Sequence, residues 1–269
     1  MYSCISGATT MPYTLEQDLE AAAKAGFEAV EIWSRKLDTY LETHSVEALK
    51  ELLDQHQLKV ASFCPYSLVG FSDNRGHIIS IRKAAEIAEA IACPVLLVCA
   101  DAPPGEIDLD DAYDAMANVA STYADMAEDY GVKIAIEPLG RHPFIPGPEE
   151  ALEIIDRAEH EALGLMMDTF HYYKSDISLD TIRNIPLEHL LIVHVNDCED
   201  LPKEDLTDQH RLHMGEGVIP LHEMLSVLKE KGYEGALSVE IFREAYWQQD
   251  PESVSIAAKG ALDRTVATL

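Results

Sequence analysis

The sequence predicts a closed barrel of eight parallel β-strands and eight α-helices, a (β/α)8 or TIM barrel, that occupies residues 1–269 as a single domain. Short apolar runs alternate with segments of helical periodicity from one end of the chain to the other. Several of the runs are apolar at every position, as expected for strands that are buried on both faces of a parallel sheet. The length of 269 residues also matches the roughly 250 residues that are typical of such barrels.

The connections between the apolar runs are long enough to hold a helix, which the pairing of parallel strands requires. An open, doubly wound sheet is the alternative, and it predicts a glycine-rich turn after the first strand. The residues there are Gly7-Ala8-Thr9-Thr10, which lack such a turn, so the closed barrel is favoured. The predicted strands are Tyr2–Ser6, Ala29–Trp33, Lys59–Cys64, Val95–Ala100, Val132–Glu137, Gly164–Asp168, Leu191–Asn196 and Ala236–Glu240.

Several helices have clear signals in the sequence. Thr14 and Gln17 have the spacing of a capping box, and Gly26 suits the left-handed residue that ends a helix. Asp250 followed by Pro251 predicts the start of the last helix. An apolar stripe at helical spacing is predicted to pack on the barrel, and it consists of Leu221, Met224, Leu225 and Leu228.

The charge of the chain excludes several classes of partner. It has 48 Asp and Glu against 20 Lys and Arg, a formal net charge of −28. Nucleic acids and anionic membranes are bound by clustered basic side chains, so we expect neither as a partner. The sequence has neither a signal peptide nor a membrane-spanning apolar stretch, which predicts a soluble, cytoplasmic protein. Its five cysteines lack paired spacing and are expected to be reduced thiols in the core.

Polar residues directly follow the apolar runs of four consecutive predicted strands in the second half of the chain. They are Glu137, Asp168, His194 and Glu240. Because barrel active sites lie at the carboxyl ends of the strands, we expect these side chains to meet at one rim. Three neighbouring carboxylates repel one another unless a proton or a cation neutralises them. The set therefore predicts a site for one divalent metal ion, with Mn²⁺ favoured and Zn²⁺, Co²⁺ or Mg²⁺ as alternatives.

Five short segments around these residues resemble the xylose isomerase-like barrel superfamily: 136–138, 167–171, 193–197, 215–217 and 238–242. Within that group the resemblance is greatest to the inosose isomerases of myo-inositol catabolism, which interconvert 2-keto-myo-inositol and 1-keto-D-chiro-inositol. The segments Leu206–Arg211 and Ser238–Arg243 and the Thr43-His44-Ser45 loop carry this narrower similarity, which extends over nearly the whole chain.

The resemblance implies that Glu137, Asp168, His194 and Glu240 hold the metal and that His171 and Arg211 hold substrate oxygens. Trp33 either stacks on an apolar sugar face or packs at the rim of the barrel. Arg243 either contacts substrate or pairs with nearby carboxylates. Glu31 could point into the barrel but is left out of the predicted site.

The expected chemistry is the transfer of a proton between adjacent carbons of a hydroxyketone, with Glu137 and Glu240 as acid and base and a metal-stabilised enediolate between the two steps. The long connection 197–217 carries several acidic residues, which favours a small neutral polyol or ketose over a sugar phosphate. A ketose 3-epimerase, a 3-dehydroshikimate dehydratase and a barrel subunit of a heteromeric sugar-processing complex are the alternatives. A homo-oligomer is compatible with the sequence.

Overall fold

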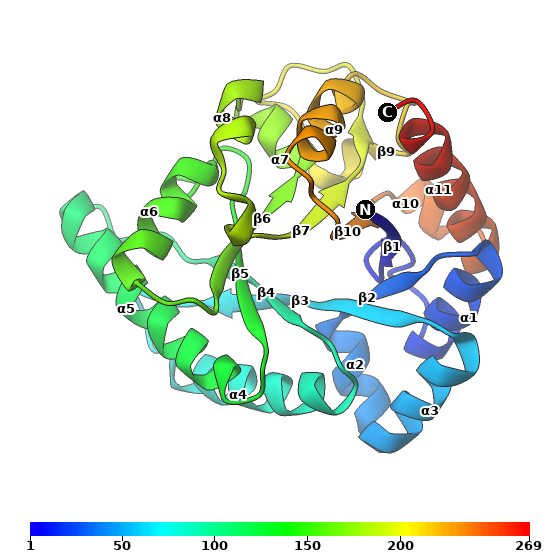
Figure 1. Cartoon of the computed structure of the whole chain (residues 1–269), viewed down its shortest axis with the longest axis horizontal. Helices are drawn as coiled ribbons and strands as arrows, with labels where there is room; N and C mark the ends of the chain where they lie inside the picture. Colours follow the sequence, from blue (N-terminus) through cyan, green and yellow to red (C-terminus); the bar gives the residue numbers. More distant parts are fainter.

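Eight parallel strands close into a barrel in the order β1-β10-β7-β6-β5-β4-β3-β2 in the computed structural model, which describes residues 1–269 (Figure 1). The predicted fold class is therefore confirmed. The strands of the barrel are β1 (Tyr2–Ser6), β2 (Ala29–Trp33), β3 (Lys59–Leu68), β4 (Val95–Ala100), β5 (Lys133–Glu137), β6 (Leu163–Asp168), β7 (Leu190–Val195) and β10 (Ala236–Val239).

The helices form a ring around the strands, and the last helix packs beside the first (Figure 1). They are α1 (Leu15–Ala25), α2 (Ser34–Leu41), α3 (Val46–His56), α4 (Arg75–Ala90), α5 (Leu109–Glu128), α6 (Pro148–Ala158), α7 (Thr169–Lys174), α8 (Leu179–Asn184), α9 (Leu221–Glu230), α10 (Glu244–Trp247) and α11 (Pro251–Val266). The sequence predicted eight helices, and the number is larger because three connections divide into two helices each. None of the helices is both long enough and apolar enough to cross a membrane.

The predicted helix signals are confirmed. Thr14 and Gln17 form the capping box of α1, and Gly26 ends that helix with φ 83°. The Asp250 side chain accepts a hydrogen bond from the amide of Ser253 at the start of α11. The four residues of the predicted apolar stripe on α9 are all buried. These local signals therefore determine where α1 and α11 begin, where α1 ends, and which face of α9 packs on the core.

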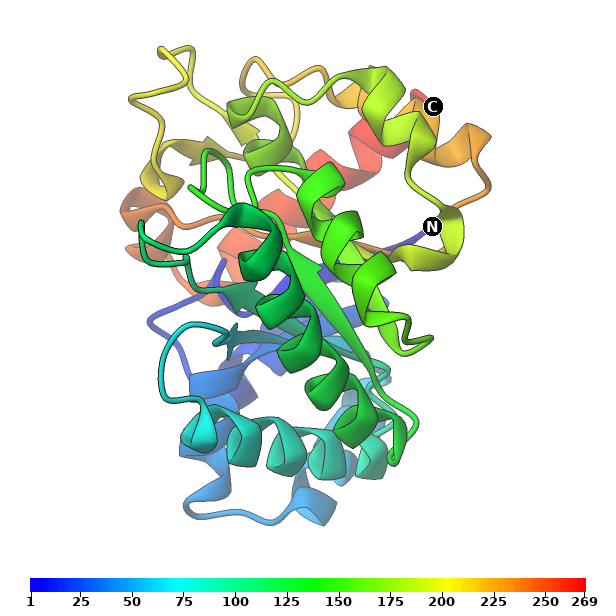
Figure 2. The ribbon, with the colours of Figure 1, turned by 90° about the vertical axis from the view of Figure 1, so that its left-hand side faces the viewer.

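The connection from Asp197 to Gly217 is more ordered than its sequence predicted. It holds two short antiparallel strands, β8 (Asp197–Cys198) and β9 (Arg211–Leu212), and a turn of 3₁₀ helix at Asp208–His210. The Asp197 carboxylate fastens the segment because it accepts hydrogen bonds from the amides of Gly215 and Gly217. Strands of two residues are too short to leave a pattern in a sequence. Figure 2 shows this connection in yellow, projecting at the upper left.

The barrel interior and the layer between the strands and helices are apolar, and the five cysteines are free thiols. Four of them are buried, and Cys99 is half-buried. Most of the buried polar residues lie at the carboxyl end of the barrel or in the loops that follow it. The exceptions include a glutamate within β2, Glu31, which is 1% exposed. This distribution separates a packed apolar interior from a polar region at one rim.

Candidate metal and substrate site

The structure brings the four predicted metal ligands together. Glu137 and Asp168 are the last residues of β5 and β6, His194 lies within β7, and Glu240 follows β10 directly. Each offers one ligand atom, and these atoms all lie within 4.8 Å of one another. All four side chains are buried. Strand register contributes to this convergence, since Asp168 is the direct partner of His194 in the pairing of β6 with β7.

Asn196 holds two of the four residues in place. Its side-chain amide donates a hydrogen bond of 3.1 Å to Oδ1 of Asp168 and one of 3.2 Å to the backbone carbonyl of Glu240. Thr169 in turn donates to Asn196 through its hydroxyl group. Asn196 is fully buried, so these bonds are not exchanged with water. The loop after β7 therefore fixes the ends of both neighbouring strands.

Arg211 supplies a fixed positive charge beside the carboxylates. Its Nη1 lies 2.6 Å from Oδ2 of Asp168 and 3.3 Å from Oε2 of Glu240. Its Nε and Nη2 both reach Oδ1 of Asp208. The guanidinium also lies 4.7 Å from the ring of Phe170, an arrangement that favours a cation. Arg211 is only 1% exposed, so its charge is poorly screened.

The carboxylates fall into two electrostatic classes. Burial raises the pKa of Glu137 to about 8, and the neighbouring Glu240 and Asp168 add to the increase. Burial likewise raises the pKa of Glu240. Burial alone would also raise the pKa of Asp168, but the charge of Arg211 outweighs it and holds that pKa below its ordinary value. The two glutamates are therefore suited to exchange protons, while Asp168 stays ionised.

His171 lies next to both the arginine and one glutamate. Its Nε2 is 3.2 Å from Nη2 of Arg211 and 3.8 Å from Oε1 of Glu137. Burial lowers the pKa of His171 to about 4, so the ring is neutral near pH 7 and can accept the hydrogen bond from Arg211. The structure thus places both predicted substrate-binding residues, His171 and Arg211, at the edge of the four-residue cluster.

Trp33 and Arg243 lie further out. Trp33 lies on the wall of a cleft of about 950 Å³, and its ring meets Phe242 edge-on with centroids 5.7 Å apart. Cys99 lines the same cleft and donates a hydrogen bond to Oε2 of Glu137, but Glu137 and the other three residues of the cluster do not line the cleft. Arg243 pairs with Glu199 at 2.7 Å. Contact of Trp33 or Arg243 with substrate stays a prediction.

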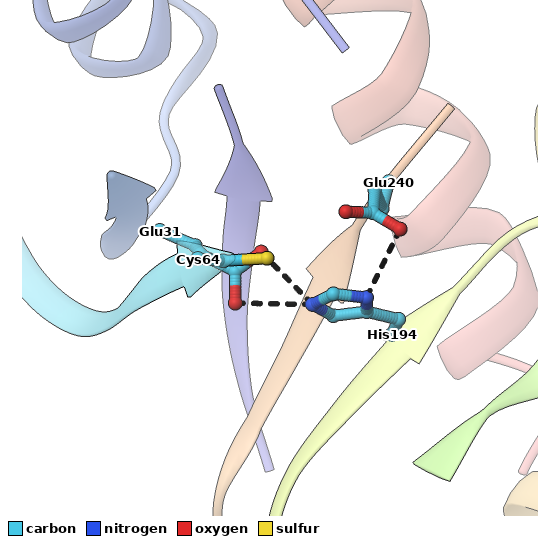
Figure 3. A group of neighbouring side chains, drawn as sticks. All are labelled: Glu31, Cys64, His194 and Glu240. Carbon is cyan, nitrogen blue, oxygen red and sulfur yellow. Dashed lines mark hydrogen bonds and ion pairs between the residues drawn. The ribbon is translucent and has the colours of Figure 1, made fainter. Parts of the chain in front are cut away.

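Glu31 is the residue that the predicted site missed. It enters the barrel from β2, and its two carboxylate oxygens lie 2.8 and 3.0 Å from Nε2 of His194. Cys64 from β3 lies nearby, and Figure 3 shows both residues facing the imidazole from the side opposite Glu240. An isolated charge in the apolar run Ala29–Trp33 was the available signal. Sequence alone could not give the direction in which that side chain points.

The donor set fits a divalent cation. Nδ1 of His194 is buried and has no hydrogen-bond partner, although it lies 3.1 Å from Oε2 of Glu240 and 3.8 Å from Oδ2 of Asp168. A buried polar atom without a partner is costly, and it is satisfied here if it binds a cation together with the carboxylates. Three carboxylates and one imidazole suit a metal of intermediate hardness. The geometry therefore supports a site for a divalent metal.

The chain is similar to inosose isomerases over nearly its whole length. The inosose isomerase of Halalkalibacterium halodurans is 32% identical over 99% of this chain and 95% of its own length. The inosose isomerase of Bacillus subtilis is 30% identical over 96% of this chain and 95% of its own length. A crystal structure described as the IOLI protein with a bound zinc atom superposes with a TM-score of 0.91 at 30% identity, covering 100% of this chain and 99% of that one.

More distant relatives catalyse other reactions. They include a fructoselysine 3-epimerase of Escherichia coli and a 3-dehydroshikimate dehydratase of Pseudomonas aeruginosa, at 22% and 27% identity. This chain covers only 37% of the dehydratase. The model of the family described as "Xylose isomerase-like TIM barrel" matches residues 19–261. The chain therefore belongs to the xylose isomerase-like TIM barrel family and is an enzyme with a sugar isomerase-like function.

Proposed function

We propose that this enzyme is a divalent-metal-dependent isomerase of a neutral cyclic polyol ketone, and that it converts 2-keto-myo-inositol into 1-keto-D-chiro-inositol. The observation that carries the proposal is the pairing of Glu137 and Glu240, two buried glutamates of raised pKa in one group with Asp168 and His194. The full-length similarity to inosose isomerases supports the choice of substrate.

Glu137, Asp168, His194 and Glu240 would hold the metal, and a bound divalent cation supplies Lewis-acid stabilisation of negative charge on substrate oxygens. Mn²⁺ is proposed because three of the four donors are carboxylates. Zn²⁺, Co²⁺ and Mg²⁺ remain alternatives, and the bound zinc of the similar IOLI structure supports a divalent ion in general.

Each proton movement can be assigned to this chain's own residues. One glutamate removes the proton from the hydroxyl-bearing carbon next to the carbonyl, and the electron pair of that bond moves toward the carbonyl oxygen. The former carbonyl carbon then receives a proton, and the proton of the neighbouring hydroxyl passes to the former carbonyl oxygen, so that the neighbouring carbon becomes the new carbonyl carbon. Glu137 and Glu240 carry out the two proton transfers at carbon, because a raised pKa lets a carboxylic acid both accept and return a proton near pH 7.

Arg211 and His171 orient the substrate. The guanidinium of Arg211 donates to hydroxyl or enediolate oxygens, and the neutral ring of His171 exchanges hydrogen bonds with a hydroxyl. Trp33 would stack on an apolar face of the substrate from the neighbouring cleft. The packing of this rim against Phe170 and Phe242 keeps water away from the reacting carbons.

The test is a parallel assay of the purified protein with Mn²⁺, Zn²⁺, Co²⁺ or Mg²⁺ after metal removal. The substrates are 2-keto-myo-inositol, D-fructose, D-tagatose and 3-dehydroshikimate, and each reaction is monitored by NMR in D₂O. The expected result is conversion of the inosose with deuterium at the carbon that receives the proton. Turnover of a ketose alone would identify a 3-epimerase, and turnover of dehydroshikimate alone would identify a dehydratase.

Size-exclusion chromatography of the same sample tests whether the protein forms a homo-oligomer, and a co-purifying second polypeptide would favour the heteromeric complex.

A further inference from the structure

The carboxylate of Glu31 lies inside the barrel, on the side of the His194 imidazole opposite Glu240 (Figure 3). It comes from the middle of β2, whereas His194 comes from β7, and β10 and β1 separate these strands in the barrel. The two side chains are both 0% exposed. The contact between them therefore crosses the barrel interior rather than following a strand pair.

Glu31 makes direct contacts that define its orientation. Oε1 lies 2.8 Å and Oε2 3.0 Å from Nε2 of His194. The hydroxyl of Ser62, its register partner on β3, donates to Oε2. A carboxylate in such a position is costly unless it is paired and hydrogen-bonded. The position is thus sustained by its partners, which are His194 and Ser62.

The contact decides which nitrogen of His194 is free. A metal binds the neutral imidazole, which carries one proton, and a carboxylate beside the nitrogen that faces away from the metal holds the proton there. With the proton on Nε2 facing Glu31, the lone pair of Nδ1 faces Glu240 and Asp168. Nδ1 is the atom that has no hydrogen-bond partner. We infer that Glu31 is a positioning residue that fixes the tautomer and the ring orientation of His194 for metal binding through Nδ1.

A second cation is the competing explanation for the same residues. Glu31, Cys64, His194 and Glu240 also offer one ligand atom each within 4.8 Å of one another. The separation of 3.0 Å between Oε2 of Glu31 and Nε2 of His194 is that of a direct hydrogen bond, which favours the positioning role. Metal stoichiometry distinguishes the two explanations.

The experiment compares Glu31→Gln and Glu31→Leu with the full-length wild-type protein. Glu28→Gln is the matched control, since Glu28 is exposed, lies just before the same strand and its side chain bonds only to Ser3. The readouts are the Zn²⁺ dissociation constant and stoichiometry by calorimetry, and the ¹H–¹⁵N spectrum of the zinc-loaded imidazoles. The positioning role predicts one zinc per chain, with Nδ1 of His194 as the bound nitrogen and a proton on Nε2.

Glu31→Leu is expected to weaken zinc binding by about 10–100-fold and to alter the imidazole spectrum. Glu31→Gln keeps a hydrogen-bond acceptor and should lose less affinity while it keeps the Nε2 proton, and Glu28→Gln should match the wild type. If Glu31→Leu does not fold, the inference is tested on the other two proteins. It is overturned if Glu31→Gln binds zinc with the affinity of the wild type and Nδ1 of His194 does not bind zinc in the wild type. Two zinc ions in the wild type, reduced to one by Cys64→Ser, would overturn it in favour of the second cation.

The inference rests on the proposed metal role of His194, and the two can fail separately. A wild-type protein that binds zinc through Nδ1 but does not convert any inosose refutes the proposed reaction and leaves the role of Glu31 intact. A Glu31→Leu variant with wild-type zinc affinity and an unchanged imidazole spectrum refutes the role of Glu31, whatever the substrate.

Discussion

Nη1 of Arg211 lies 2.6 Å from Oδ2 of Asp168, so a buried guanidinium shares a carboxylate with the proposed metal site. The same Nη1 lies 3.3 Å from Glu240. In the metal-free protein Arg211 is therefore a permanent buried counter-charge of the cluster, beside the imidazole of His194. A bound divalent cation would add two positive charges to that of Arg211, and the three ionised carboxylates would balance the sum.

Arg211→Met should destabilise the metal-free protein by about 3–5 kcal/mol, because it leaves buried carboxylates without their cation. Added Zn²⁺ should then raise the melting temperature more in the variant than in the wild type, since the metal replaces the lost charge. Differential scanning calorimetry with and without Zn²⁺ measures both effects. Arg75→Met is the control, because Arg75 pairs with Asp73 on the exposed surface and its loss should change little. An equal rise in melting temperature on addition of Zn²⁺ in Arg211→Met and in the wild type would contradict this account of Arg211.

Glu240→Gln should reduce kcat by about 10²–10⁴-fold, because an amide cannot transfer the proton. Glu240 is also a proposed ligand, so the metal content of the variant has to be measured and the assay run at saturating metal. Glu28→Gln removes the same charge at the opposite end of the barrel and should leave kcat unchanged. Turnover within a few-fold of the wild type in fully metallated Glu240→Gln would exclude Glu240 as acid or base.

Metal affinity should increase with pH up to about 8. Burial raises the pKa of Glu137 to about 8, so at lower pH the metal has to displace a proton from this carboxyl group. The raised pKa of His194 acts in the same direction, since its neighbours Glu240 and Glu31 outweigh its burial. The apparent Zn²⁺ dissociation constant, measured by calorimetry between about pH 6 and 9, should fall about tenfold or more per pH unit at first and flatten above about 8. A constant value across this range would show that neither group binds a proton in the metal-free site.

Lys36→Met should lower the free energy of unfolding by about 3–5 kcal/mol. The Lys36 ammonium lies 2.6 Å from Asp18 and donates to the carbonyls of Gly7 and Thr10, and both charged side chains are less than 10% exposed. The variant leaves the Asp18 carboxylate buried and unpaired. Urea denaturation measures the loss, and the double variant with Asp18→Asn should recover part of it. Lys24→Met, on the exposed surface, is the control. A loss no larger than in that control would mean that Asp18 is not stabilised by Lys36.

The barrel and its four strand-end residues could be predicted because both follow from local sequence patterns. Apolar runs define the strands, and a polar residue that ends such a run has to lie at the carboxyl rim. Glu137 and Asp168 show this directly, since each is the last residue of its strand. Most of the predicted strand boundaries are identical to the observed ones and the others differ by one residue, except that β3 continues four residues beyond Cys64.

The interactions across the barrel could not be predicted in the same way. The position of Glu31 opposite His194 depends on strand tilt and on the register shift between Val30 and Glu31, neither of which leaves a sequence pattern. The contact of Arg211 with Asp168 likewise depends on the path of the connection after β7. Contacts between residues that are far apart in the sequence depend on how the whole chain packs, so only the structure shows them.

The arginine and the metal donors reach the site on different parts of the fold. Glu137, Asp168 and His194 are built into the barrel wall, whereas Arg211 arrives on the small β8–β9 sheet that Asp197 fastens. Exchanging that segment for the corresponding one of another family member would change which arrangement of substrate hydroxyls is admitted, while the four chelating side chains would stay on the barrel. The fold thereby places selectivity and chelation on separate segments, which are linked through the contact of Arg211 with Asp168.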